Sequence, residues 1–152
     1  MNENYPFINT PLPYAYNALE PYIDTETMRL HHDAHLKTYI DNLNAVLENY
    51  PMLQQLTLEQ LVNLSPIRHM PAKDQIKLEQ NAGGVYNHRL FFDSLAPAAM
   101  LQPENQLADA IINDFGSLDK FRLSFDEAAE SVFGSGYAWL GVNRRGNLVI
   151  VT

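Results

Sequence analysis

Histidines are the residues of this chain best suited to chemistry, and three of its five stand within five positions. The stretch TMRLHHDAHLKTY, residues 27 to 39, contains His31, His32 and His35. Imidazole nitrogens bind manganese, iron and zinc, and they also transfer protons near neutral pH. Burying several imidazoles without partners is costly, so the cluster favours a functional role over packing alone. Because the chain has no cysteine, any metal site must use nitrogen and oxygen ligands.

The spacing of the histidines is compatible with two ways of holding a metal. His31 and His35 stand one helical turn apart and could chelate one ion together, although the glutamate of the zinc-protease motif is absent. Alternatively, His31 binds the metal with His88, which would come from a second, antiparallel helix. In that arrangement His35 would touch a partner or support the ligands, and Tyr39 would be a hydrogen-bonding gate. Spacing does not choose between the two.

A long helix must position the cluster. Asp24 is a good N-cap, and a helical pattern runs from about Thr25 to Asn49 before Pro51 ends it. On a helical wheel one face is expected to pack inward, and it carries Met28, His31, His32, His35, Tyr39, Leu43, Val46 and Tyr50. The opposite face is polar, with Asp33, Lys37, Asp41, Asn44 and Glu48. All three histidines are therefore predicted to face the core.

A second long helix is predicted from about Ala72 to Leu95. Its expected buried row consists of Asn81, Gly84, Val85, His88, Phe91, Phe92 and Leu95. Two adjacent glycines, Gly83 and Gly84, interrupt this helix, and each costs about 1 kcal/mol relative to alanine. The glycines therefore predict close approach by another group beside His88.

The remaining segments complete an α+β fold. Four prolines between residues 5 and 22 predict an extended arm, and Thr57 with Gln60 predicts a capping box on a short helix. After residue 100 we expect helices over 103–114 and 117–133, then an antiparallel hairpin formed by YAWLGVN and LVIVT. The predicted organisation is an antiparallel helical hairpin domain over residues 1–97, followed by a truncated α/β domain with a small antiparallel sheet over 98–152.

Charge and composition narrow the possible partners. The net charge is −8 and no lysine or arginine cluster occurs, so nucleic acid and anionic membranes are not expected partners. No apolar run approaches 18 residues, and the N-terminus lacks the pattern of a secretory signal. We therefore expect a cytoplasmic location and no membrane association.

Four motifs resemble the iron/manganese superoxide dismutases, in the same order as in that family. They are LPYAYNALEPYIDTETMRLHHDAHLKTYIDNLN, NAGGVYNHRLFF, DFGSLDKF and FGSGYAWL. The resemblance implies that His31 and His88 are metal ligands and that Tyr39 gates substrate entry. It implies that His35 lies in the access funnel and contacts a tyrosine of a neighbouring subunit, so a homo-oligomer, a homodimer in the simplest case, is expected. Tyr137 and Trp139 fall on aromatic positions that line the site in the family.

The resemblance also bears on the metal and on activity. Iron-type members tend to carry glutamine at the position of Gly84, whereas manganese-type members carry glycine, so manganese is expected and iron is the alternative. The implied reaction is disproportionation of superoxide to oxygen and hydrogen peroxide. Family members continue with a motif like DVWEHAYY, whose aspartate and histidine complete the set of metal ligands. In this chain, His32 and His69 match no ligand position of the family. The expectation is a dismutase impaired by two absent ligands; the alternative is a non-catalytic remnant acting as a dimerisation or weak metal-binding module.

Overall fold

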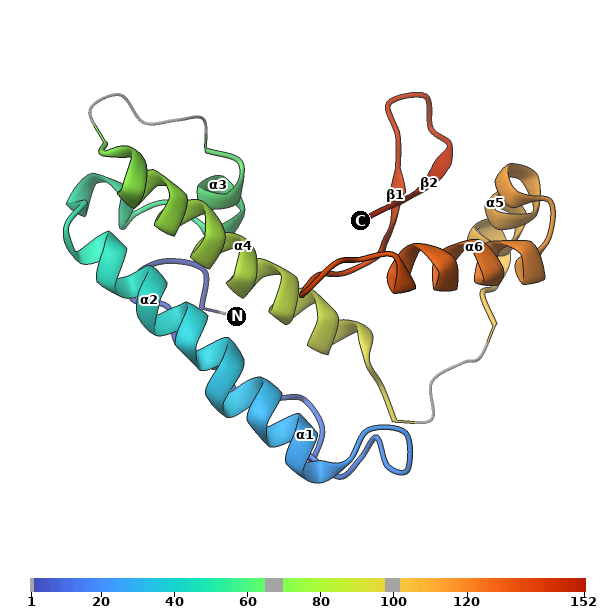
Figure 1. The fold of residues 1–152 in the computed structure, drawn as a ribbon, viewed down its shortest axis with the longest axis horizontal. Helices are drawn as coiled ribbons and strands as arrows, with labels where there is room; N and C mark the ends of the chain where they lie inside the picture. Colours follow the sequence, from blue (N-terminus) through green and yellow to red (C-terminus); the bar gives the residue numbers. More distant parts are fainter. Residues whose placement is uncertain (1, 65–69, 98–101) are drawn as a thin grey trace. The chain divides into compact units, whose positions relative to one another are not determined.

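The computed structural model describes residues 2–64, 70–97 and 102–152 (Figure 1). The chain divides into two compact units, Met1–Ala99 and Met100–Thr152, and each is described by itself. His69 and the predicted start of the second domain at Ala98 lie outside the described residues. Within the described ranges, no helix combines the length and the apolar character needed to cross a membrane.

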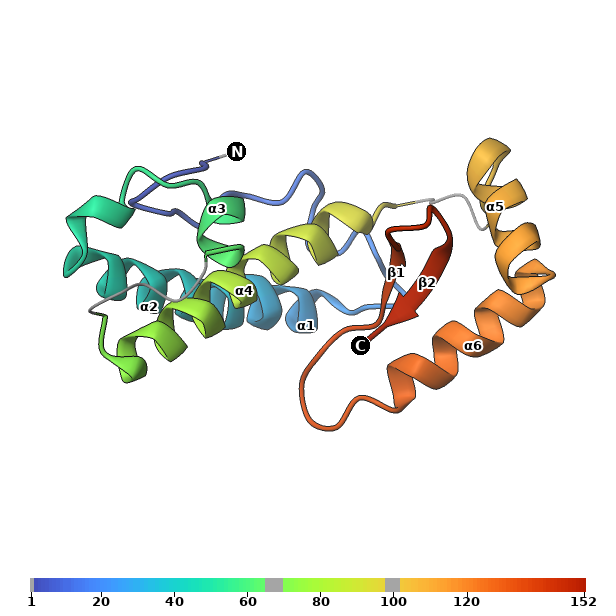
Figure 2. The same cartoon turned by 90° about the horizontal axis from the view of Figure 1, so that it is seen from above.

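The first unit is an antiparallel helical hairpin. One arm of the hairpin is a continuous helical rod built from α1 (Thr25–Arg29), η1 (Leu30–Leu36) and α2 (Lys37–Glu48). The other arm is α4 (Ala72–Ser94), and Figures 1 and 2 show it running beside the rod in the opposite direction. Both predicted long helices are confirmed to within one residue at each end. The Asp24 side chain accepts a 2.8 Å hydrogen bond from the Thr27 amide, which confirms the predicted N-cap.

The central segment of the rod, η1, is a π-helix that the sequence pattern did not predict. A π turn bonds residue i to i+5, so side chains rotate relative to the 3.6-residue wheel. Leu36 and Ile40 are buried beside His32, whereas His35 is exposed. The prediction that all three histidines face the core is therefore wrong for His35. Asn44, on the opposite polar face, is half-buried: its side chain accepts a 2.9 Å hydrogen bond from the Phe7 amide and donates a 2.8 Å hydrogen bond to the Phe7 carbonyl.

The core of this unit lies between the rod, α4 and α3 (Leu58–Val62). Its buried apolar side chains include Met28, Leu36, Ile40, Leu43, Leu47, Leu61, Leu78, Ala82, Val85 and Phe92. Of the row predicted on the second helix, Val85, His88 and Phe92 are buried, and the other members are half-buried. The capping box of Thr57 and Gln60 at the start of α3 is confirmed. A short 3₁₀ turn, η2 (Pro51–Leu53), follows α2.

The N-terminal arm, residues 2–23, contains turns but no helix, as predicted. Its turns between residues 15 and 23 are closed by backbone hydrogen bonds, so this part is more compact than an extended arm. Arg89 holds the beginning of the arm: its two terminal nitrogens donate to the carbonyls of Asn2 at 2.9 Å and Ile8 at 3.1 Å. Its guanidinium also lies 5.7 Å from the ring centre of Phe7. The arm is thus fastened along the hairpin.

The second unit contains α5 (Asn105–Phe115), α6 (Leu118–Glu130), β1 (Trp139–Val142) and β2 (Leu148–Val151). The two strands form the predicted antiparallel pair, with Trp139 opposite Val151 and Val142 opposite Leu148. Helix α6 ends at Glu130 rather than at Phe133, because a tighter turn from Val132 to the carbonyl of Ala129 follows it. The expected α+β fold, a helical hairpin followed by helices and a small sheet, is confirmed.

Candidate metal centre

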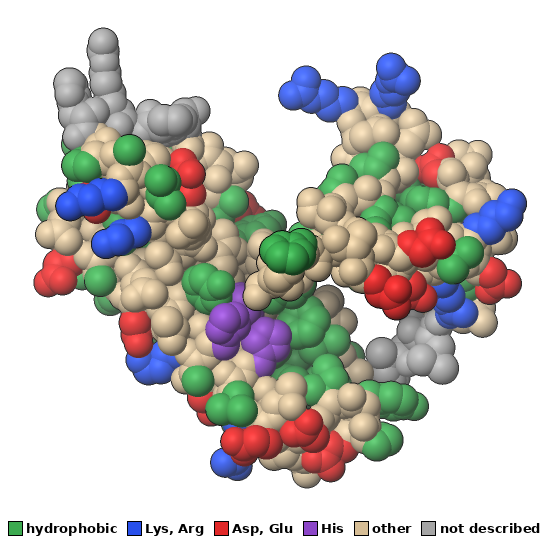
Figure 3. Space-filling model, in the orientation of Figure 1, with side chains coloured by type: hydrophobic (Ala, Val, Ile, Leu, Met, Phe, Trp, Pro, Cys, Tyr) green, Lys and Arg blue, Asp and Glu red, His purple; other side chains and the backbone are tan. Residues whose placement is uncertain are grey.

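Three imidazoles from the two arms of the hairpin meet at one place. His31 and His35 project from η1, and His88 projects from α4. The ring centroid of His88 lies 4.9 Å from that of His31 and 4.9 Å from that of His35. The centroids of His31 and His35 are 5.8 Å apart. Figure 3 shows histidine side chains reaching the surface together on this unit. The structure therefore brings together all three histidines considered as ligands.

His88 is oriented as a metal ligand would be. It is 4% exposed, and its Nδ1 lies 2.7 Å from the carbonyl oxygen of Gly84, one turn earlier in α4. A carbonyl only accepts hydrogen bonds, so Nδ1 carries the proton and the lone pair is left on Nε2. Metal-ligating histidines are usually held by such a bond to a backbone carbonyl. Burial lowers the pKa of His88, which favours the neutral ring that binds metal.

His31 packs against aromatic rings. The rings of Phe92 and Phe91 lie 5.0 and 5.4 Å from its own, centre to centre. Burial, followed by the neighbouring charges of His88 and His35, lowers the pKa of His31 to about 4. His31 is therefore neutral at neutral pH, with a lone pair available to a metal ion.

Tyr39 packs directly on the backbone of α4 at Gly84. A Cβ atom built at position 84 would lie only 2.7 Å from Cγ of Tyr39, closer than real contacts of this kind. The predicted close approach beside His88 is therefore confirmed for Gly84, and Tyr39 is the approaching group. At Gly83 an added Cβ would meet nothing within 4 Å, so the prediction is wrong there.

The Tyr39 ring completes a group of four with the imidazoles. Its centroid lies 5.1 Å from that of His35 and 5.2 Å from that of His88. His35 is exposed and Tyr39 is half-buried. Tyr39 and His35, the two residues predicted to control access, thus lie next to the predicted ligand His88. His35 is the one of them that is exposed at the surface.

His32 lies apart from this group, in a polar network that the sequence pattern did not reveal. Its ring contacts Asp33 and Tyr16, and Asp33 accepts a 2.6 Å hydrogen bond from the Tyr16 hydroxyl. The hydrogen bonds from Tyr16 and His32 lower the pKa of Asp33. Burial, together with the nearby Asp33 carboxylate, raises the pKa of Tyr16 to about 12. The wheel placed Asp33 on the polar face opposite the histidines, so its contact with His32 was not predicted.

The donor set fits a transition metal in part. His31 and His88 supply two neutral nitrogen donors of the kind that manganese, iron and zinc accept. Within residues 2–64, 70–97 and 102–152, no group of three or more His, Cys, Asp or Glu side chains is arranged to hold a metal ion. His31 and His88 as metal ligands therefore stay a prediction that the chemistry of two neutral imidazoles allows. Tyr137 and Trp139, with ring centroids 5.5 Å apart, lie in the other unit.

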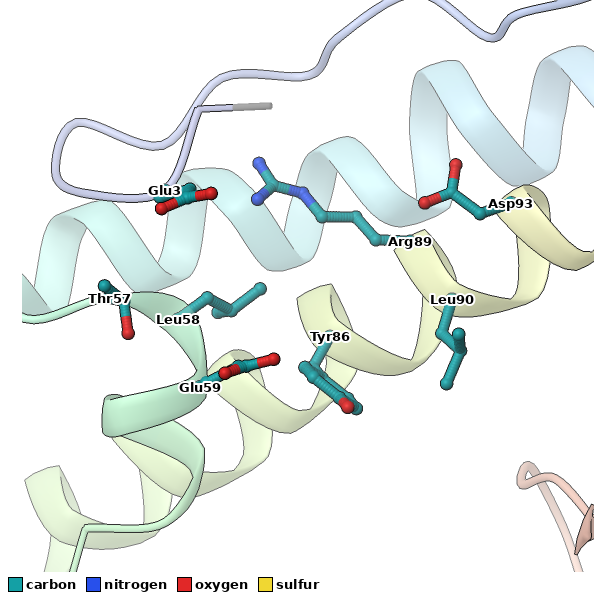
Figure 4. A pocket seen from close by; sticks show the side chains of 8 residues that line it. All are labelled: Glu3, Thr57, Leu58, Glu59, Tyr86, Arg89, Leu90 and Asp93. Atoms are coloured by element: carbon teal, nitrogen blue, oxygen red, sulfur yellow. The ribbon is translucent and has the colours of Figure 1, made fainter. Parts of the chain in front are cut away.

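The first unit also has a cavity of about 370 Å³, and its lining residues differ from those of the histidine group. Figure 4 shows its lining, which comes from the arm, α3 and α4: Glu3, Thr57, Leu58, Glu59, Tyr86, Arg89, Leu90 and Asp93. It contains none of the predicted ligand or gate residues. Arg89 contributes to this wall while its guanidinium reaches the arm (Figure 4).

The fold and the site define an α+β protein whose helical hairpin presents imidazoles suited to a transition metal. Two family models match the chain: "Iron/manganese superoxide dismutases, alpha-hairpin domain" over residues 6–96, and the C-terminal domain of the same family over residues 103–152. The chain belongs to the iron/manganese superoxide dismutase family.

Curated relatives agree with this membership. Manganese superoxide dismutase 1 of Leptolyngbya boryana is 44% identical over 142 residues, which cover 93% of this chain and 56% of that protein. The manganese superoxide dismutases of Salmonella typhimurium and Escherichia coli are each 46% identical over 129 residues, covering 85% of this chain and 61% of theirs. The chain therefore spans a little over half the length of these relatives.

Proposed function

We propose that this chain serves the disproportionation of superoxide to oxygen and hydrogen peroxide, with His31 and His88 as two ligands of a manganese ion. The observation that carries the proposal is the 2.7 Å hydrogen bond from Nδ1 of His88 to the Gly84 carbonyl. It puts the proton on Nδ1 and the lone pair on Nε2, and a second imidazole lies next to this ring with its centroid 4.9 Å away. A bound manganese or iron would supply one-electron oxidation and reduction.

The chain's own residues would hold the ligands and control access. His31 and His88 stay neutral, which keeps their lone pairs available. Tyr39 lies between Gly84 and His35, so its phenol can donate a proton on the side where His35 opens to solvent. His35 would return a proton from water to the Tyr39 phenol after that donation, because it is the exposed member of the group. Tyr39 and His35 are thus the proposed residues of proton delivery and substrate entry.

Manganese is the proposed metal, and iron is the alternative within the family. The relatives above are named manganese enzymes. In addition, the Tyr39 ring occupies the space above Gly84, where a longer side chain would not fit without moving it. This packing supports glycine at the position where iron-type members tend to have glutamine.

The activity of the 152-residue chain alone is proposed to be low. Two imidazoles are few donors for a metal of this class. The competing proposal is a non-catalytic module that dimerises or binds metal weakly, and it is favoured by the lack of a third ligating side chain among the described residues. Homo-oligomer formation and a cytoplasmic location stay predictions from the sequence.

Metal content and superoxide consumption, measured on the same purified sample of the chain, test this proposal. We expect sub-stoichiometric manganese and weak dismutation, both abolished by His88→Ala. Near-stoichiometric metal with strong dismutation would contradict the impairment. Metal binding that survives His88→Ala would contradict the proposed ligand, and binding without any dismutation would favour the non-catalytic module.

A further inference from the structure

His32 is the most buried histidine of the described residues, at 3% exposure, although it stays outside the imidazole group. Its Nε2 lies 3.0 Å from the carbonyl oxygen of Thr10. Its Nδ1 lies 2.7 Å from a carboxylate oxygen of Asp33 and 3.1 Å from the Tyr16 hydroxyl. Both ring nitrogens therefore lie within hydrogen-bond distance of oxygen atoms, which restrains the orientation of the ring.

The N-terminal arm provides most of these partners. Thr10 and Tyr16 belong to the arm, and so does Asn9, whose Nδ2 donates a 3.0 Å hydrogen bond to the backbone carbonyl of His32. The arm thus binds both the side chain and the backbone of one residue in η1. Because π-helical turns are uncommon and are often found at functional sites, this external support bears on how η1 presents its other side chains.

Phe92 connects this network with the proposed ligand His31. The Phe92 ring is 2% exposed, and its centroid lies 5.5 Å from that of His32 and 5.0 Å from that of His31. The backbone carbonyl of Phe92 accepts a 2.9 Å hydrogen bond from the hydroxyl of Tyr14, another arm residue. In a close-packed interior, a shift of the His32 ring moves Phe92 and changes the wall against which His31 rests.

We propose that His32, held by Tyr16 and the arm, is a positioning residue that sets the orientation of the His31 ring toward His88 through Phe92. The role in metal binding rests on the proposed function, in which His31 and His88 are ligands. The positioning itself is a property of the metal-free chain. It assigns a task to the second histidine of the HHDAH stretch, the one that matches no ligand position in the family.

The test uses the full chain with Tyr16→Phe, which removes one hydroxyl and keeps the ring. Tyr22→Phe is the matched control, because it makes the same change at an arm residue that is 93% exposed. His32→Gln is the second variant, which replaces the ring by an amide. Backbone amide spectra establish that each variant is folded before any comparison.

Two readouts are compared across these proteins: the ring ¹⁵N and ¹H resonances of His31 without metal, and the affinity for Mn²⁺ from paramagnetic broadening. We expect Tyr16→Phe and His32→Gln to shift the His31 ring resonances and to weaken Mn²⁺ binding by about tenfold, as loss of an outer partner typically does. Tyr22→Phe should change neither.

The proposal is overturned if folded Tyr16→Phe and His32→Gln leave the His31 resonances where the control leaves them. It is also overturned if their affinities equal that of the control while the wild type binds Mn²⁺. A wild type that binds no Mn²⁺ contradicts the proposed function instead, and the metal-free resonances of His31 then decide the positioning role alone.

Discussion

The ring of Tyr39 occupies the space that a side chain at position 84 would need. A Cβ atom there would come within 2.7 Å of Cγ of Tyr39. The glycine one turn before His88 therefore does two things in α4: its carbonyl fixes the tautomer of His88, and its missing side chain admits the proposed gate residue.

Alanine substitution at the two adjacent glycines should have opposite effects. Gly83→Ala meets no neighbour within 4 Å and gains helix propensity, so we expect stabilisation by about 0.5–1 kcal/mol. Gly84→Ala must displace Tyr39, and we expect destabilisation by about 1–3 kcal/mol from overpacking. Urea unfolding of the two variants measures the difference. Equal stability of the pair would show that Tyr39 does not occupy this space.

Arg89 is expected to hold the arm through its fork of donors. A lysine cannot donate to the carbonyls of Asn2 and Ile8 with the same planar geometry, so Arg89→Lys should lower the free energy of unfolding by about 1–2 kcal/mol. Arg144→Lys, at an exposed position, is the matched control. Urea unfolding and limited proteolysis of the arm report the effect. An unchanged urea midpoint in Arg89→Lys would mean that the contacts with Asn44 and His32 hold the arm without the Arg89 guanidinium.

The titration of Asp114 should be visible at the amide of Leu148. Hydrogen bonds from that amide, at 2.7 Å, and from the Asn147 side chain lower the pKa of Asp114 below its usual 3.8. Because the pKa of Asp114 is lower in the folded than in the unfolded state, its ionised carboxylate stabilises the folded second unit at pH values above the unfolded-state pKa. This stabilisation is lost as pH falls through the lower folded-state value.

The measurement is the Leu148 amide shift as a function of pH. We expect a midpoint below 3.8 in the wild type and no such step in Asp114→Asn. Asp109→Asn, an exposed position on the same helix, should leave the step in place. A Leu148 midpoint at or above 3.8 would show that the carboxylate does not bind β2 in solution.

Much of the fold could be predicted because its signals are local. The Asp24 cap, the capping box of Thr57 and Gln60, and the proline-bounded helices each depend on neighbouring residues. The antiparallel hairpin of β1 and β2 follows from alternating apolar residues around RRGN.

The site could be predicted only in part because its geometry depends on packing. The wheel placed His35 on the buried face, whereas Leu36 and Ile40 pack inward beside His32 and His35 is exposed in the π turn of η1. That turn accompanies contacts from the arm to His32, which are distant in sequence and leave no periodic trace. Similarly, the glycine pair predicted a close approach but not which glycine needed it, because Tyr39 reaches only Gly84.

A Mn²⁺ titration of the wild type, His31→Ala, His88→Ala and His35→Ala decides between the two candidate ligand pairs. Electron paramagnetic resonance of free Mn²⁺ gives the bound fraction for each protein. We expect the wild type to bind Mn²⁺ and His31→Ala and His88→Ala each to lose binding, while His35→Ala keeps it. Loss of binding in His35→Ala with retention in His88→Ala would rule out His88 as a ligand and support the pair of His31 and His35.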